Sequence, residues 1–236
     1  MRIITIGREF GSGGRELGHQ LAKRLQVPYY DQEIISAIAK RTALAEKYVQ
    51  ANLDLTFQGQ TQEAKEILGA SDSDLKKVYE NGINAFVQDC LLNGVETEND
   101  FSETYGVLIK EIFSSARYQV SGVKKTGSKT CEVTVKYQPV DVFTRFMPKL
   151  KEESEKIQAD KDAGKYSGTD EEIKEAMVLD YMTGAYSLLR SSYLDMQYGE
   201  KQEYTFTVTQ KGRNTWSLGD EELNGFIERI LELDKL

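Results

Sequence analysis

Three closely spaced glycines near the start of the chain carry the clearest chemical signal in the sequence. Gly11, Ser12, Gly13 and Gly14 are followed directly by Arg15. Glycine has no Cβ, so the backbone N–H groups of such a loop can approach an anion closely, and a guanidinium beside them can pair with a phosphate. These five residues form the predicted phosphate-binding site, and a plain turn between a strand and a helix is the alternative interpretation.

The elements around this loop suit a phosphate cradle. Residues 2–6 predict a short buried strand because most of them are apolar or β-branched, and apolar residues recur at helical spacing over 15–25. The unpaired N–H groups and the dipole at the start of a helix attract negative charge. An extended piece at 27–30 and a helix from an N-cap at Asp31 toward Arg41 would complete a β-loop-α-β-α segment.

The first 48 residues resemble a known family. The motif Ile-Gly-Arg-Glu-Phe-Gly-Ser-Gly-Gly-Arg-Glu at 6–16 and the motif Pro-Tyr-Tyr-Asp at 28–31 are similar to the opening of the bacterial cytidylate kinase-like family. The resemblance implies a P-loop kinase that transfers the γ-phosphate of ATP to a nucleoside monophosphate with Mg²⁺. Gly14 stands where such loops carry a lysine, and Glu16 stands near the position of the Mg²⁺-binding Ser or Thr.

The rest of the chain resembles a different group. Residues 48–236 are similar to a domain of unknown function in secreted lipoproteins of Gram-positive bacteria, and the similarity rests on segments at 48–54, 105–113, 133–140 and 179–182. This resemblance implies exported relatives, and a small molecule or a cell-envelope component as partner. Helices followed by a bent antiparallel sheet also resemble the nuclear transport factor 2 type of cone, which often holds a pocket between sheet and helix.

The pattern beyond the first segment predicts an α+β domain over 49–236, preceded by a truncated kinase-like segment over 1–48. Residues at helical and alternating spacing predict one helix that ends at Gly59, further helices over 61–68, 75–91, 105–113, 143–164, 170–196 and 223–231, and hairpins over 118–137 and 204–218. A capping box at 169–172 begins the helix that we expect to be the longest. Inward strand positions favour core packing for the aromatic residues Tyr118, Tyr137, Tyr204, Phe206 and Trp216.

The charge and composition of the chain limit the classes of partner that we expect it to bind. Lys and Arg number 30 against 38 Asp and Glu. The first 48 residues hold 8 basic and 5 acidic residues, and the remainder holds 22 and 33. An acidic body disfavours nucleic acid. No apolar run reaches the roughly 18 residues of a membrane span, and no signal peptide is visible, so we expect a cytoplasmic protein as written.

Few residues outside the glycine loop offer chemistry. His19 is the only histidine, and we expect it to be exposed. Carboxylates at 152–153 and 171–172 are typical of solvated helix faces and caps. The two cysteines, Cys90 and Cys131, lack metal-ligand spacing and are expected to be core thiols, with a disulfide as the alternative. We therefore predict no catalytic residue and no metal site.

Two functions follow from this reading. The first is a non-catalytic binding or interaction module that carries a vestigial phosphate-binding loop, with the further hypothesis that the reading frame is chimeric at residues 40–55. The second is a cytidylate kinase-like enzyme, in which case ATP and Mg²⁺ would be its cofactors.

Overall fold

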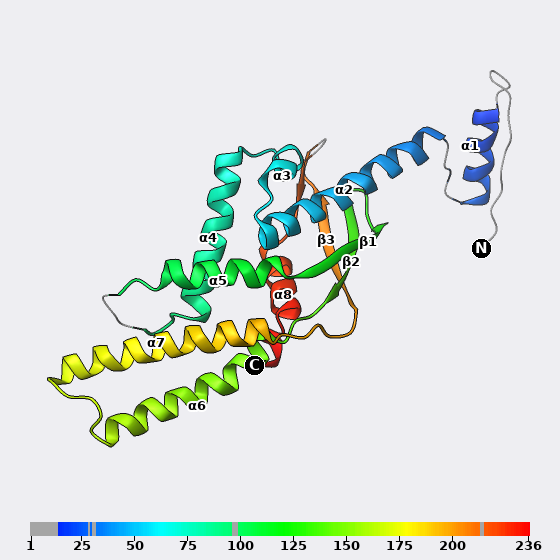
Figure 1. Ribbon diagram of the computed structural model, residues 1–236. Helices are drawn as coiled ribbons and strands as arrows, with labels where there is room; N and C mark the ends of the chain where they lie inside the picture. Colours follow the sequence, from blue (N-terminus) through cyan, green and yellow to red (C-terminus); the bar gives the residue numbers. More distant parts are fainter. Residues whose placement is uncertain (1–13, 28, 30–31, 96–98, 213–214) are drawn as a thin grey trace. The chain divides into compact units, whose positions relative to one another are not determined.

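The computed structural model describes residues 14–27, 29, 32–95, 99–212 and 215–236 (Figure 1). The chain divides into two compact units, Met1–Leu44 and Ala45–Leu236. The second unit combines helices with an antiparallel sheet, which confirms the predicted α+β class. The expected strand at 2–6 and most of the glycine loop lie outside the described residues.

The first described helix, α1, spans Gly14–Leu25, close to the predicted bounds. It has an acidic residue in its first turn and basic residues in its last turn, an order that complements the helix dipole. Leu17 and Leu25 of its apolar stripe are 61% and 48% exposed. Much of the apolar surface of this short helix is therefore open to solvent.

Helix α2 spans Gln32–Gln58 and is 27 residues long. We expected one helix toward Arg41 and a separate helix ending at Gly59. The expected break between the two was wrong. Residues 42–48 contain no glycine or proline and are mostly good helix formers, so the helix continues through them. It ends where Gly59 adopts a left-handed φ of 64°. The predicted domain boundary after residue 48 falls within this helix and stays a prediction.

The buried stripe of α2 begins within the second unit. It consists of four fully buried residues at intervals of four: Ala45, Val49, Leu53 and Phe57. Residues four apart lie on one face of a helix, so this stripe forms one wall of the core. Three helices follow, at the bounds α3 Thr61–Leu68, α4 Asp72–Cys90 and α5 Ser102–Ser114, close to prediction.

Four antiparallel strands form one sheet in the order β1-β2-β3-β4. Their bounds are β1 Arg117–Lys125, β2 Thr130–Gln138, β3 Gln202–Gln210 and β4 Trp216–Ser217. Both predicted hairpins are present, although the return strand of the second contains only two residues. Along β2, buried and less buried residues alternate as the period-two pattern indicated.

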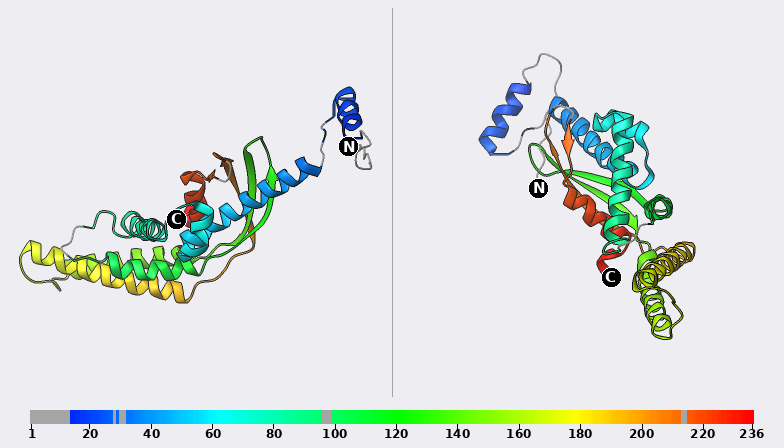
Figure 2. Two further views of the ribbon diagram at one scale, coloured as in Figure 1. Left: turned by 90° about the horizontal axis from the view of Figure 1, so that it is seen from above. Right: turned by 90° about the vertical axis from the view of Figure 1, so that its left-hand side faces the viewer.

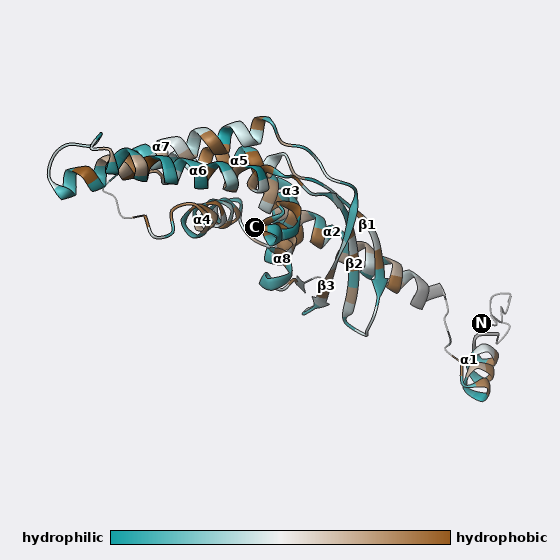
Figure 3. Cartoon of the chain, turned by 90° about the horizontal axis from the view of Figure 1, so that it is seen from below, coloured by the Kyte–Doolittle hydropathy of each residue, from teal (hydrophilic) through white to brown (hydrophobic). Residues whose placement is uncertain are grey.

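A long helical hairpin is inserted between the adjacent strands β2 and β3. Helix α6 spans Val142–Asp162, and helix α7 spans Asp170–Leu194. The two helices run side by side away from the sheet (Figure 2), and the outer part of α6 is mostly hydrophilic (Figure 3). The predicted capping box at the start of α7 is confirmed. With 25 residues, α7 is shorter than α2, so the expectation that it is the longest helix was wrong.

The core lies between the sheet, α2 and α8, which spans Asp220–Ile230. Phe226 of α8 is fully buried, and its ring lies 5.2–5.9 Å from four other aromatic rings. Its partners are Phe57, Tyr137, Tyr204 and Phe206. Aromatic pairs at this distance add packing energy beyond their buried area. The predicted inward strand aromatics thus serve the core.

Candidate functional site

A pocket of about 470 Å³ lies between α4 and α8 in the second unit, and we call it the α4–α8 pocket. Leu55 and Thr56 of α2, Phe113 of α5 and Leu233 beyond α8 complete its walls. Within the described part of the chain, all of its lining residues belong to helices. This position differs from the place between sheet and helix that the cone resemblance implied.

Two neighbouring stripes of α4 form the largest wall of the pocket. One stripe consists of Val78, Gly82, Ala85 and Asp89. The adjacent stripe consists of Tyr79, Ile83, Phe86 and Cys90. Spacings of three and four residues place each stripe on one helix face. The lining is mostly apolar, with a few polar groups, as is usual for small-molecule sites.

The titratable groups of the pocket do not form a catalytic set. Partial burial, followed by the nearby Asp89 carboxylate, raises the pKa of the Cys90 thiol. Burial, followed by Glu80, also raises the pKa of the Tyr79 hydroxyl. A protonated thiol is a poor nucleophile, and no histidine lines the pocket to activate it. The pocket therefore offers mainly apolar contacts, with a protonated thiol at Cys90.

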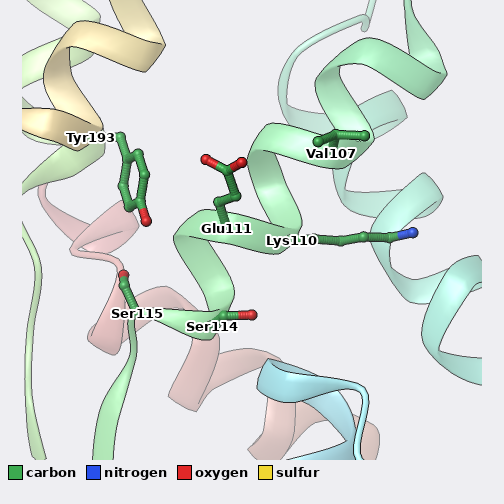
Figure 4. Close-up of a pocket in the computed structure, with 6 residues that line it drawn as sticks. All are labelled: Val107, Lys110, Glu111, Ser114, Ser115 and Tyr193. Atoms are coloured by element: carbon green, nitrogen blue, oxygen red, sulfur yellow. The ribbon is translucent and has the colours of Figure 1, made fainter.

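A second, shallow depression of about 460 Å³ lies between α5 and α7 (Figure 4). Tyr193 and Glu111 lie on one side of it, whereas the Lys110 side chain points away from both. The Lys110 ammonium lies 2.6 Å from a carboxylate oxygen of Glu80, so its charge is already paired. Burial, followed by Glu111, raises the pKa of Tyr193. This open depression also lacks a nucleophile paired with a base.

The predicted phosphate-binding residues are only partly described. Gly11, Ser12 and Gly13 lie outside the described residues, and Gly14 and Arg15 are the first residues of helix α1. The described part of α1 thus includes the last two residues of the predicted site. The binding site itself stays a prediction.

Other sequence candidates have structural roles or none. His19 is exposed, and its ring lies 5.6 Å from that of Tyr29. Glu172 caps α7, and Glu153 forms an ion pair of 2.9 Å with Lys156. No group of three or more His, Cys, Asp and Glu residues that could hold a metal occurs in the described ranges. None of the helices that the structure describes is both long and apolar enough to cross a membrane.

The cysteines differ from each other. Cys131 is buried in β2, as expected of a core thiol, whereas Cys90 lies at the surface of α4, so the expectation was wrong for this residue. No disulfide joins the two. The sequence analysis did not identify the α4–α8 pocket, although a glycine inside the α4 pattern was a visible signal.

Two comparisons with known proteins give a match to this chain. Residues 3–113, somewhat less than half of the chain, match the model of the cytidylate kinase-like family. The match continues beyond residue 48, farther than the motifs indicated. Comparison with curated proteins found no match.

The fold is similar to the crystal structure of a protein from Bacillus subtilis subsp. subtilis str. 168 (ycdA) that is described as a lipoprotein. The TM-score is 0.55 at 16% sequence identity, with 85% of this chain and 60% of that chain covered. The present chain thus spans 60% of that protein, and at this identity the likeness concerns the fold alone. Both resemblances expected from the sequence, to the kinase-like family and to a lipoprotein, are confirmed.

Proposed function

We propose that residues 45–236 form a non-catalytic binding module that holds a small apolar ligand in the α4–α8 pocket. The observation that carries this proposal is the pocket itself. Its volume of about 470 Å³ lies within the roughly 300–1,000 Å³ of small-molecule sites, and its walls are mostly apolar. Since the described titratable groups form no catalytic set, binding is the activity that this site supports best.

Nile red, a neutral dye that fluoresces in apolar surroundings, tests the proposal. We expect saturable fluorescence with the full chain, and loss of that fluorescence in the variant Gly82→Leu. Gly82 lines the pocket, and no heavy atom lies within 4 Å of a Cβ added there, so a leucine can enter the space without a backbone clash. The control is Asn84→Leu, at an exposed position of the same helix that does not line the pocket. Equal binding by both variants would refute the proposal.

The glycine loop is, in this proposal, a vestigial phosphate site. A nucleotide kinase needs parallel strands, a metal-binding acidic strand end and arginines at the transferring phosphate. The described sheet is antiparallel, and its strands lie outside the first segment. Calorimetric titration with ATP and with CMP tests the loop, beside a variant with Gly13→Asp and Arg15→Ala. Absence of heat at millimolar nucleotide would support a vestigial loop.

The competing function is a cytidylate kinase-like enzyme, which the family match over residues 3–113 favours. Transfer of phosphate from ATP to CMP in the presence of Mg²⁺ would establish it, provided that the double loop variant abolishes the transfer. The family match runs across residues 40–55, which weighs against the hypothesis of a chimeric reading frame. Long single-molecule reads of genomic DNA across those codons test that hypothesis.

A further inference from the structure

We infer that the α4–α8 pocket selects a small organic cation with an apolar body, such as an alkylammonium ion. This inference rests on the proposed function, because it assumes that the pocket binds a ligand. It adds the charge of that ligand, which neither family comparison specifies.

The charged lining residues of the pocket are both carboxylates. Asp89 comes from α4 and Glu228 comes from α8, so the two helices that form the main walls each contribute one negative charge. No lysine or arginine lines the pocket among the described residues. A cationic group in the pocket is therefore attracted by both carboxylates, whereas an anionic group is repelled.

The interior of the pocket suits a hydrocarbon body. Ile83 and Phe86 of α4 face the space together with Phe113 of α5, and Leu223 and Ile227 of α8 line it as well. Each CH₂ group that leaves water for such a wall contributes favourable transfer free energy. Apolar walls with acidic side chains match an amphipathic molecule that has one positive end.

Gly82 is an exposed residue of α4 at which the wall of the pocket carries no side chain. Glycine inside a helix is less favourable than alanine, so it often has a packing reason. Here no heavy atom lies within 4 Å of an added Cβ, and no described neighbour requires the missing side chain. The glycine therefore leaves the pocket wall open at this point, next to the apolar side chains that line it.

Displacement of Nile red from the full chain tests the charge preference. The competitors are octylammonium, 1-octanol and octanoate, which share one alkyl chain and differ in the charge of the head group. Exposed ion pairs contribute roughly 0.2–1 kcal/mol each, so two carboxylates should lower the half-displacing concentration of octylammonium about 2- to 30-fold relative to octanol. Octanoate should be the weakest competitor, and added salt should reduce the differences.

The variant with Asp89→Asn and Glu228→Gln should bring octylammonium and octanol to equal potency, with the affinity for Nile red measured anew for this variant. A variant with Glu63→Gln and Glu66→Gln, two exposed carboxylates of α3 that do not line the pocket, makes the same change in net charge and should keep the preference. Equal potency of octylammonium and octanol on the unmodified chain would overturn the inference and leave the proposed function standing. Failure of Nile red to bind would instead overturn the proposed function.

Discussion

The hydroxyl of Tyr105 donates a hydrogen bond of 2.7 Å to the main-chain oxygen of Met182, and this bond joins α5 to α7. Both residues are only 1% exposed. Burial, followed by the neighbouring Tyr181 and Tyr186, raises the pKa of Tyr105 well above its ordinary range. The hydroxyl is therefore protonated and can donate at any physiological pH.

Removing this hydroxyl should loosen the attachment of the α6–α7 hairpin. We expect Tyr105→Phe to lower the free energy of unfolding by about 0.5–1.5 kcal/mol, the usual net value of one internal hydrogen bond. Urea denaturation measures the change. The control is Tyr166→Phe, which removes an exposed hydrogen bond to Asp180 and should have a smaller effect. Equal effects of the two variants would contradict the assigned role of the buried bond.

Stability should fall at alkaline pH through Tyr118 of β1. Its hydroxyl donates a hydrogen bond of 2.8 Å to Asp54 of α2, and burial, followed by this carboxylate, raises its pKa well above the ordinary value of about 10. The unfolded chain then releases the proton near pH 10, while the folded chain keeps it. The stabilisation is complete below that pH and is lost as the pH rises further, by up to about 1.4 kcal/mol per pH unit.

Urea denaturation at pH 8–11 measures this slope. Tyr118→Phe should make the decline with pH shallower, because one group with a raised pKa is removed. An unchanged slope in that variant would assign the alkaline loss of stability to other tyrosines.

Two glycines offer a matched pair for separating backbone strain from steric contact. Gly59 and Gly69 have similar left-handed φ angles of 64° and 70°. A Cβ at Gly59 would lie 2.8 Å from the Tyr79 ring, whereas nothing lies within 4 Å of one at Gly69. We expect Gly69→Ala to lower the free energy of unfolding by about 1–2 kcal/mol through strain, and Gly59→Ala to lower it further. Equal losses in thermal or urea denaturation would show that Tyr79 yields freely.

The contribution of the α7 capping box to stability should be measurable with single substitutions. The Thr169 hydroxyl accepts a hydrogen bond of 3.3 Å from the Glu172 N–H, and the Thr169 N–H donates one of 2.7 Å to the Glu172 carboxylate. Thr169→Ala should lower the free energy of unfolding by about 1 kcal/mol. Thr169→Ser keeps a capping hydroxyl and should lower the free energy of unfolding much less. Hydrogen exchange in the first turn of α7 should rise in the alanine variant only.

Local patterns identified most elements of the second unit. The alternation along β2 and the capping residues of α7 depend on near neighbours in the sequence, and both predictions are confirmed. The sequence pattern did not predict the continuity of α2, because the two family resemblances meet near residue 48, whereas local helix propensity continues through residues 42–48. Periodicity indicates that a residue is buried, and it does not identify the partner.

The α4–α8 pocket could not be predicted for that reason. Asp89 and Glu228 are far apart in the chain, and only the tertiary packing of their helices brings them to one pocket. Gly82 was the local signal that could have drawn attention to α4. The glycine loop is the opposite case. Its residue types and their order indicated phosphate binding from the sequence alone, and that function stays a prediction.

The insertion of α6 and α7 between two neighbouring strands also bears on how the chain is made. Val133 of β2 pairs with Phe206 of β3. The β1–β2 hairpin therefore cannot pair with β3 until the whole α6–α7 hairpin and β3 have left the ribosome. At typical rates of translation this delay is on the order of seconds. During that interval a growing chain presents one sheet edge and an apolar face, and chaperones that recognise such surfaces would meet it there.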